Sequence, residues 1–213
     1  AHRLGFHGEE LWTGFYTCDT GKFSKVAENR FRNFRKNKTW NRRLLFVGRL
    51  IERKGVKTLI DAYEEYQNKV KEPWGLTIAG RGPMSRIIKD RKDIDYLGFV
   101  QPSDIQDLYL KAGAFVFPSY NEHWGVVIHE ATTSGLPVIS TFGCLSTNKL
   151  LTDNYNGFLI ESENPKLLSK KFFELGALEN DTLFSWGKRS WELAQQYRTE
   201  LWADRLVEKV IKF

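Results

Sequence analysis

Short apolar runs alternate with longer amphipathic segments along most of this chain, and no other feature restricts its fold as much. Apolar runs bounded by turn residues are typical of buried strands, whereas apolar residues spaced three or four apart are typical of helices. The predicted strands are residues 44–47, 76–79, 94–97, 114–117, 138–140 and 157–160. The predicted helices are residues 57–70, 85–91, 103–111, 166–177, 182–197 and 201–211, and a further helix that follows residues 122–125 and reaches residue 134.

This alternation predicts an α/β fold: a doubly wound, Rossmann-like parallel sheet of about six strands, with helices on both faces and a helical C-terminal tail. The 213 residues suit one domain. We expect a partial linker or interdomain segment over residues 1–43, a Rossmann-like domain over 44–197 and a C-terminal helix over 198–213. Ligands of such sheets bind at the carboxyl ends of the strands, so the site is expected in the strand-to-helix loops.

The composition narrows the class of protein further. Cys18 and Cys144 lie far apart, which argues against a disulfide framework and indicates free thiols in a reducing cytoplasm. No apolar run is long enough to cross a membrane, and the first residues do not resemble a signal peptide. We therefore expect a cytoplasmic protein, with possible peripheral contact on the inner membrane face. The start at Ala1 instead of Met favours a fragment of a longer protein.

The net charge of +6 is concentrated in the segment from Arg30 to Arg43, where basic residues alternate with aromatic ones. Such a cluster favours anionic partners, which include nucleic acid, anionic lipid and nucleotide phosphates. A solvated linker without a specific partner has the same pattern. Both interpretations stay open at this point.

Two predicted loops combine glycine with basic residues. Residues 48–55 contain Gly48, Arg49, Lys54 and Gly55, so the backbone can approach a ligand closely while the two cations neutralise phosphate. A tight turn with exposed charges would use the same residues. The loop at residues 80–83 is too short for a Walker loop and is weak evidence by itself.

A third loop, residues 118–130, carries Glu122 and Glu130 around the start of a predicted helix. The amino end of a helix attracts anions such as diphosphate, without a metal. Carboxylates would repel a phosphate but can accept hydrogen bonds from the hydroxyls of a sugar and a ribose. Together these residues indicate a glycosylated nucleotide as the ligand, provided that both glutamates face one pocket.

At this point the chain resembles retaining glycosyltransferase family 4, whose C-terminal domain carries two glutamates separated by seven residues. Glu122 and Glu130 match this spacing, and residues 134–139 match the Gly–aliphatic–Pro–Val entry to the next strand. Residues 46–50 with 54–55, residues 79–83 and residues 97–100 occur in the family's order as well. The resemblance covers residues 44–160, and it implies a donor-binding domain of the GT-B architecture.

The resemblance also implies roles for individual residues. Arg49 and Lys54 would hold the diphosphate, Glu130 the ribose, and Glu122 the donor sugar. The implied catalytic residues are Glu122, Arg49 and Lys54. The implied donor-binding residues are Gly48, Gly82, Leu97, Phe99, Val100, His123, Trp124, Gly125, Val126 and Glu130. Residues 4–19 resemble the stretch where the family's chain leaves its N-terminal domain, which would place a missing acceptor-binding domain upstream.

The chain departs from the family pattern in three places. Cys144 follows Gly143 where two adjacent glycines are common, Lys149 stands where glutamate is common, and the segment up to Gly157 is about two residues longer than usual. These changes leave the geometry of that loop, and with it the donor sugar, open. In addition, Trp124 replaces the commoner Phe.

We expect no cofactor and no metal, because His123 and His129 lie six residues apart without a third ligand nearby. The donor substrate would be a nucleoside diphosphate sugar, and the resemblance favours UDP over GDP or ADP. The alternatives are a non-catalytic nucleotide-sugar-binding protein, a GT-B nucleotide-sugar epimerase, and a module that binds polyanions or membrane surfaces. Nucleic acid is not an expected partner.

Overall fold

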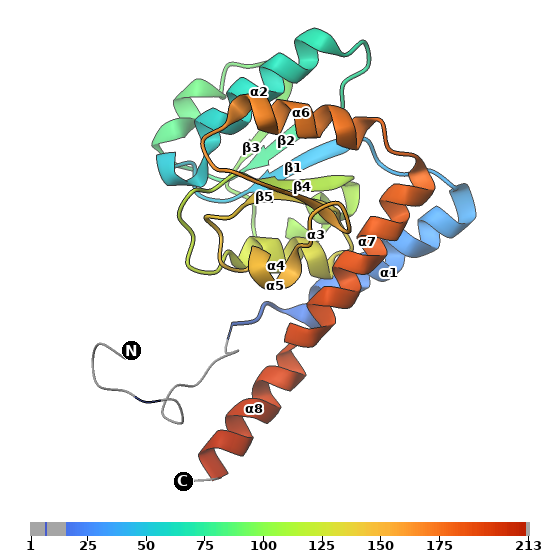
Figure 1. The fold of residues 1–213 in the computed structure, drawn as a ribbon, viewed down its shortest axis with the longest axis vertical. Coiled ribbons are helices and arrows are strands. Elements are labelled where there is room, and N and C mark those ends of the chain that lie inside the picture. The colour runs from blue at the N-terminus through green and yellow to red at the C-terminus, as the bar shows by residue number, and fades with distance from the viewer. Residues whose placement is uncertain (1–6, 8–15, 212–213) are drawn as a thin grey trace.

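The computed structural model describes residue 7 and residues 16–211, which form an α/β fold around one parallel sheet (Figure 1). The strands are β1 (Arg43–Val47), β2 (Gly75–Ala79), β3 (Ile94–Gly98), β4 (Ala114–Phe117), β5 (Val138–Thr141) and β6 (Gly157–Ile160). Their order is β3-β2-β1-β4-β5-β6, and every neighbouring pair is parallel. The predicted fold class is therefore confirmed, down to the number of strands.

The helices are α1 (Thr20–Asn37), α2 (Val56–Lys69), α3 (Ile105–Lys111), α4 (Val126–Thr133), α5 (Thr147–Leu150), α6 (Pro165–Gly176), α7 (Asn180–Ala194) and α8 (Thr199–Ile211). Three short 3-10 segments join them: η3 (Glu52–Lys54), η4 (Pro83–Ile87) and η5 (Gln195–Tyr197). Helices α2 and α6 lie against each other on one face of the sheet, and α3, α4 and α5 lie on the other (Figure 1). Helix α8 extends away from the sheet and buries none of its residues. Within the described part of the chain, no helix is long and apolar enough to span a membrane.

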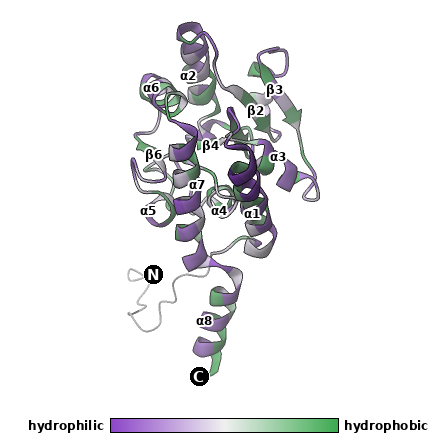
Figure 2. Cartoon of the chain, turned by 90° about the vertical axis from the view of Figure 1, so that its right-hand side faces the viewer, coloured by the Kyte–Doolittle hydropathy of each residue, from purple (hydrophilic) through white to green (hydrophobic). Residues whose placement is uncertain are grey.

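The burial of each strand follows its place in the sheet. All residues of β4 and β5 are buried because these strands lie in the interior of the sheet with helices on both sides. Edge strand β3 instead alternates, with Ile94 buried and Leu97 exposed. Hydrophilic and hydrophobic residues alternate along the helices in Figure 2, as expected when only one helical face meets the core.

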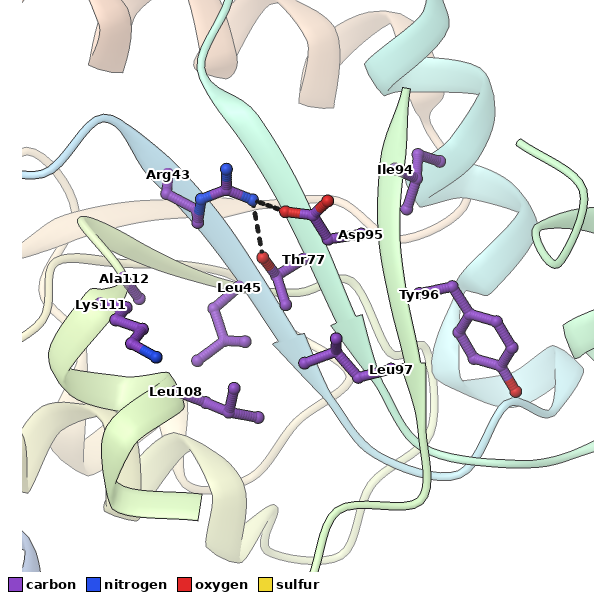
Figure 3. A pocket seen from close by; sticks show the side chains of 10 residues that line it. All are labelled: Arg43, Leu45, Thr77, Ile94, Asp95, Tyr96, Leu97, Leu108, Lys111 and Ala112. Atoms are coloured by element: carbon purple, nitrogen blue, oxygen red, sulfur yellow. Dashed lines mark hydrogen bonds and ion pairs between the residues drawn. The ribbon is translucent and has the colours of Figure 1, made fainter. Parts of the chain in front are cut away.

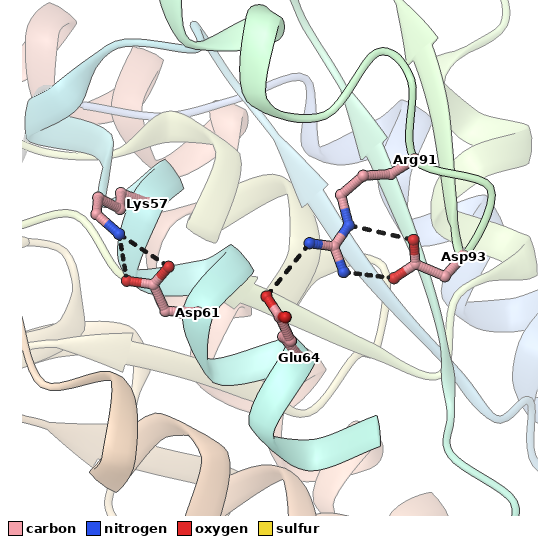
Figure 4. Close-up of polar contacts among 5 residues, drawn as sticks. All are labelled: Lys57, Asp61, Glu64, Arg91 and Asp93. Atoms are coloured by element: carbon pink, nitrogen blue, oxygen red, sulfur yellow. Dashed lines mark hydrogen bonds and ion pairs between the residues drawn. The ribbon is translucent and has the colours of Figure 1, made fainter. Parts of the chain in front are cut away.

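Ion pairs fix the segment before β3 to the neighbouring helix. Arg91 contacts Asp93 at 2.7 Å and Glu64 of α2 at 3.5 Å (Figure 4). On the same helix, Lys57 and Asp61 pair at 2.7 Å, one turn apart. These pairs are largely exposed, so each contributes at most about 1 kcal/mol.

Several predicted helix boundaries change in the structure. Residues 85–91 do not form an α-helix; the segment is the 3-10 turn η4, because the apolar spacing of Met84, Ile87 and Ile88 fits either geometry. The helix expected after residues 122–125 does begin there, at Val126, directly after Gly125, whose φ is 84°. The helix over residues 182–197 begins earlier, at Asn180, and ends as η5.

The segment predicted as a linker, residues 1–43, contains helix α1. Asp19 caps its start by accepting a hydrogen bond from the Lys22 amide at 3.0 Å, and its apolar face packs against α3, α4 and α7. Periodicity could have revealed this helix, but the dense basic charge obscured it. Residues 4–6, which resemble a departure from an N-terminal domain, lie outside the described residues, so the domain boundaries stay a prediction.

Arg30 shows that the basic cluster is not uniformly solvated. It is only 5% exposed and donates hydrogen bonds to the carbonyl oxygens of Ser134 at 3.1 Å, Ala112 at 2.6 Å and Tyr109. One guanidinium thus supplies hydrogen bonds to carbonyl oxygens at the C-terminal ends of α3 and α4. Arg32 and Arg35 are exposed, so the solvent-facing charge of the cluster belongs to the other face of α1.

Candidate functional site

The loops that follow β1, β2 and β3 meet at the carboxyl end of the sheet and are joined by backbone hydrogen bonds. The Gly48 amide donates to the Ala79 carbonyl at 3.0 Å, and the Leu50 amide donates to the Arg81 carbonyl at 2.9 Å. Because parallel strands end at the same edge, residues from separate loops share this surface.

A pocket of about 280 Å³ opens between these loops. It is lined by three predicted donor-binding residues, Gly48, Phe99 and Val100, and by the predicted catalytic residue Arg49. The guanidinium of Arg81 also lines it and lies 5.9 Å from the centre of the Phe99 ring. Arg81 was missed as a site residue, although its place in a glycine-rich loop after a strand was the available signal. Gly82 lies beside the pocket, and a Cβ there would meet the Leu50 carbonyl oxygen at 2.3 Å.

Leu97 lies elsewhere, although it was predicted to flank the base with Phe99 and Val100. Its side chain lines a larger pocket of about 650 Å³ on the open face of β1, β2 and β3 (Figure 3). There Arg43 contacts Thr77 at 3.0 Å and pairs with Asp95. Side chains alternate between the two faces of a strand, and this alternation turns Leu97 away from the loop pocket.

Lys54 and Glu122 form an ion pair between the loops after β1 and β4. Their side chains are 11% and 15% exposed, so the pair is largely withdrawn from water. The Lys54 ammonium also lies 5.1 Å from the centre of the Phe117 ring. Burial and then the charges of Arg53 and Arg49 lower the pKa of Lys54.

The loop that contains Glu122 is held against residues 143–146. The Glu122 amide donates to the Gly143 carbonyl at 2.9 Å, and the Ser146 amide donates to the Trp124 carbonyl at 3.1 Å. The thiol of Cys144 is buried here, and burial raises its pKa to about 11. The sequence's departure at Cys144 is thus accommodated as packing beside Gly125. Helix α4 begins directly after Gly125 without a side-chain cap.

Glu130 lies on α4 but faces α3. It accepts a hydrogen bond from the Tyr109 hydroxyl at 2.8 Å, and burial raises its pKa while this hydrogen bond partly opposes the shift. Its hydrogen-bond partner thus lies on α3, whereas Glu122 pairs with Lys54 of the loop after β1. Ile105, which lines the loop pocket, lies one turn from Tyr109 on α3.

The remaining candidates flank the start of α4. His123 is exposed, Trp124 is half-buried and Val126 is 38% exposed. His129 is fully buried, and burial lowers its pKa to about 4, so it is a neutral core residue. Among the described residues, no group of three or more His, Cys, Asp or Glu side chains could hold a metal ion.

Comparison with known proteins places this geometry in a family. The model of the glycosyl transferases group 1 family matches residues 27–188. An uncharacterized glycosyltransferase of Methanocaldococcus jannaschii is 34% identical over 130 residues, which cover 57% of this chain and 32% of the relative. The GtfA subunit of the Streptococcus agalactiae UDP-N-acetylglucosamine–peptide N-acetylglucosaminyltransferase is 29% identical over 168 residues, covering 74% of this chain and 31% of the relative. The chain thus spans about a third of the length of these relatives.

Solved structures share the fold. The Anabaena protein HepE in complex with UDP has a TM-score of 0.78 at 19% identity, covering 100% of this chain and 60% of that one. The C-terminal domain of the glycosyl transferase group 1 protein LpcC from Francisella tularensis has a TM-score of 0.69 at 22% identity, covering 85% and 99%. With a family model over most of its length and a GT-B C-terminal fold, this chain belongs to the glycosyl transferases group 1 family.

Proposed function

We propose that this chain is the donor-binding domain of a retaining hexosyltransferase that uses a nucleoside diphosphate sugar, with UDP favoured as the nucleotide. The structural neighbour HepE in complex with UDP and with UDP-glucose supports the nucleotide. In this proposal an acceptor-binding domain precedes the chain, residues 44–197 form the donor domain, and residues 198–213 form a separate C-terminal helix. The domain is inactive without its partner domain.

The buried pair of Lys54 and Glu122 beside Arg49 is the observation that carries this proposal. Arg49 lines the loop pocket, and its charge is close enough to lower the pKa of Lys54. A largely buried cation and carboxylate are costly to maintain unless partners satisfy them. A diphosphate next to Lys54 and a sugar hydroxyl next to Glu122 would supply such partners.

The proposed mechanism separates the roles of these charges. The base enters the pocket of Phe99 and Val100, and the diphosphate lies between Arg49, Lys54 and the amino end of α4. Negative charge grows on the diphosphate as the bond to the sugar breaks, so fixed positive groups there stabilise the transition state more than the bound donor. Glu122 then holds the sugar hydroxyls and Glu130 the ribose hydroxyls.

Nucleotide binding tests this function directly. Isothermal titration with UDP, GDP, ADP and their sugars should show binding of one nucleotide, which Lys54→Ala and Glu130→Ala weaken. Lys57→Ala is the matched lysine control, because its side chain is 72% exposed and pairs only along α2. Glu174→Ala, on α6, is the matched glutamate control. A chain that binds none of these nucleotides, or variants that bind as well as the controls, would refute the proposal.

The non-catalytic alternative and the epimerase alternative predict the same binding and differ in the reaction. A transferase forms a glycosylated acceptor when the chain is joined to its acceptor domain, whereas an epimerase converts one nucleotide sugar into another. A binding protein does neither. Product analysis of the full-length protein with labelled donor separates the three.

Peripheral contact with an anionic membrane at the cytoplasmic face is a second proposal. The outer face of α1 and helix α7 enclose a pocket of about 440 Å³, whose lining combines Arg32, Arg35 and Lys188 with one acidic residue, Glu28, and the rings of Phe31 and Trp191. Basic groups near an anionic leaflet each contribute about 1 kcal/mol of attraction. Co-sedimentation with phosphatidylglycerol vesicles, but not phosphatidylcholine vesicles, should fall in an Arg32→Glu, Arg35→Glu variant. Equal sedimentation of the variant would refute this contact.

A further inference from the structure

Two tyrosines from outside the sheet hold the ring of Trp124, the residue before Gly125. Tyr16 stacks on it with ring centres 5.6 Å apart and planes at 16°. Tyr197 of η5 contacts it with centres 6.1 Å apart and planes at 60°. Such pairs stabilise a packed arrangement beyond the area that they bury. The side chain at the start of α4 is thus fixed by the segments just before α1 and just before α8.

These two segments are also tied to each other. The Thr17 hydroxyl donates to the Tyr197 carbonyl at 2.7 Å, and the Thr199 hydroxyl donates to the Cys18 carbonyl at 3.0 Å. The Thr199 amide donates to the Thr20 hydroxyl at 3.1 Å. The two tyrosines therefore belong to one connected unit, although about 180 residues separate them in the chain.

Tyr197 contacts α4 at a second place. Its ring lies 6.4 Å from the ring of His129, with planes at 90°. His129 is buried, so the contact is a packed one inside the fold. Tyr197 consequently contacts both Trp124, which lies just before α4, and His129, which lies in its first turn.

The backbone of Trp124 is fixed from the opposite side. Its carbonyl accepts hydrogen bonds from the Ser146 amide at 3.1 Å and from the Cys144 thiol at 3.4 Å. The loop from Glu122 to Gly125 is therefore held by residues 143–146 on one side, while the two tyrosines hold the Trp124 ring. A change at either support would move the backbone that leads into α4.

We propose that Tyr16 and Tyr197 form an aromatic clamp that positions Trp124, and through it the donor-binding loop, so that donor affinity depends on the junction before α8. This inference rests on the proposed function. The two tyrosines are positioning residues that act through Trp124. Since α8 extends from this junction, anything that shifts α8 would alter the donor loop through the same contacts.

A double-mutant cycle tests the clamp, with UDP affinity of the 213-residue chain measured by isothermal titration. Tyr197→Ala should weaken UDP binding about tenfold, equivalent to about 1.4 kcal/mol, whereas Tyr197→Phe, which keeps the ring, should bind as the native chain does. In a Trp124→Ala background, Tyr197→Ala should have a much smaller effect, because the proposed route to the donor runs through Trp124 and only the contact with His129 remains. Tyr155→Ala is the matched control, since Tyr155 is exposed and packs against Arg189 instead.

Each outcome has a defined meaning. Additive effects of the Tyr197 and Trp124 changes, or unaltered affinity of Tyr197→Ala, would overturn the clamp while leaving the donor site intact. If Tyr197→Ala does not fold, Tyr16→Ala makes the same test from a side chain that is 58% exposed, with an expected loss of about threefold. A native chain that binds no nucleotide would overturn the proposed function and the clamp together.

Discussion

Replacing Gly125 by alanine tests how the loop before α4 is built. Gly125 has φ 84° and ψ 64°, a left-handed conformation that costs a residue with a Cβ about 1–2 kcal/mol. The added Cβ would also lie 2.6 Å from the Cys144 sulfur and 3.2 Å from Cγ of Glu122, well inside ordinary contact. Overpacking of this kind costs about 1–3 kcal/mol. We therefore expect Gly125→Ala to lower the free energy of unfolding by about 2–5 kcal/mol.

Urea denaturation followed by circular dichroism measures this loss. Adding Cys144→Ala removes the sulfur that the new Cβ meets, so the double variant should recover the steric part and keep the backbone strain. Gly21→Ala is the control. Gly21 lies in α1, and an added Cβ would have its nearest neighbour, the Asp19 carboxylate, 3.8 Å away, so alanine there should be neutral or stabilising. A stable Gly125→Ala variant, or strict additivity with Cys144→Ala, would refute the reasoning.

Three further predictions concern buried charges. Lys54→Met leaves the Glu122 carboxylate unpaired and should cost about 3 kcal/mol of unfolding free energy in urea denaturation, most of which Glu122→Gln should restore; no recovery would refute the pairing. Burial raises the pKa of Glu130 above its usual 4.5. The free energy of unfolding therefore falls as the pH rises from about 4.5 through the higher pKa of the folded state. Glu130→Gln should therefore melt higher than the native chain at about pH 7 but not at about pH 4, and a lower melting temperature at both would contradict this. Arg30→Met removes donors from three buried carbonyls and should cost about 3–5 kcal/mol by the same assay, whereas exposed Arg32→Met should cost under about 0.5 kcal/mol; equal losses would refute the buried role of Arg30.

The fold was predictable because its signals are local. The apolar run of each strand, and the glycines that end them, indicated six strands and the loops between them without any knowledge of distant contacts. Helix α1 was not predicted, since its apolar stripe, which includes Phe23 and Phe34, lies among many basic residues. Gly125 precedes α4 in a left-handed conformation that the sequence permits but does not require.

The candidate site was predictable only in part. Arg49, Phe99 and Val100 meet in one pocket, as loops at a common sheet edge should. Leu97 turns to the other face, and Glu130 turns towards Tyr109 on α3. Which way a side chain points depends on the register of its strand or the rotation of its helix, and neither is set by the residue's own neighbours in the chain.

The sequence by itself determined the parallel sheet, its strand-to-helix loops and the residue types that those loops present, because hydrophobic period and turn residues act over a few positions. Only the tertiary structure decided that Lys54 pairs with Glu122, that Arg30 is buried and donates hydrogen bonds to three carbonyls, and that the Tyr197 ring contacts Trp124. These contacts join residues tens of positions apart. They form because burying charges and rings demands particular partners, and the chain supplies those partners only once the helices have packed on the sheet.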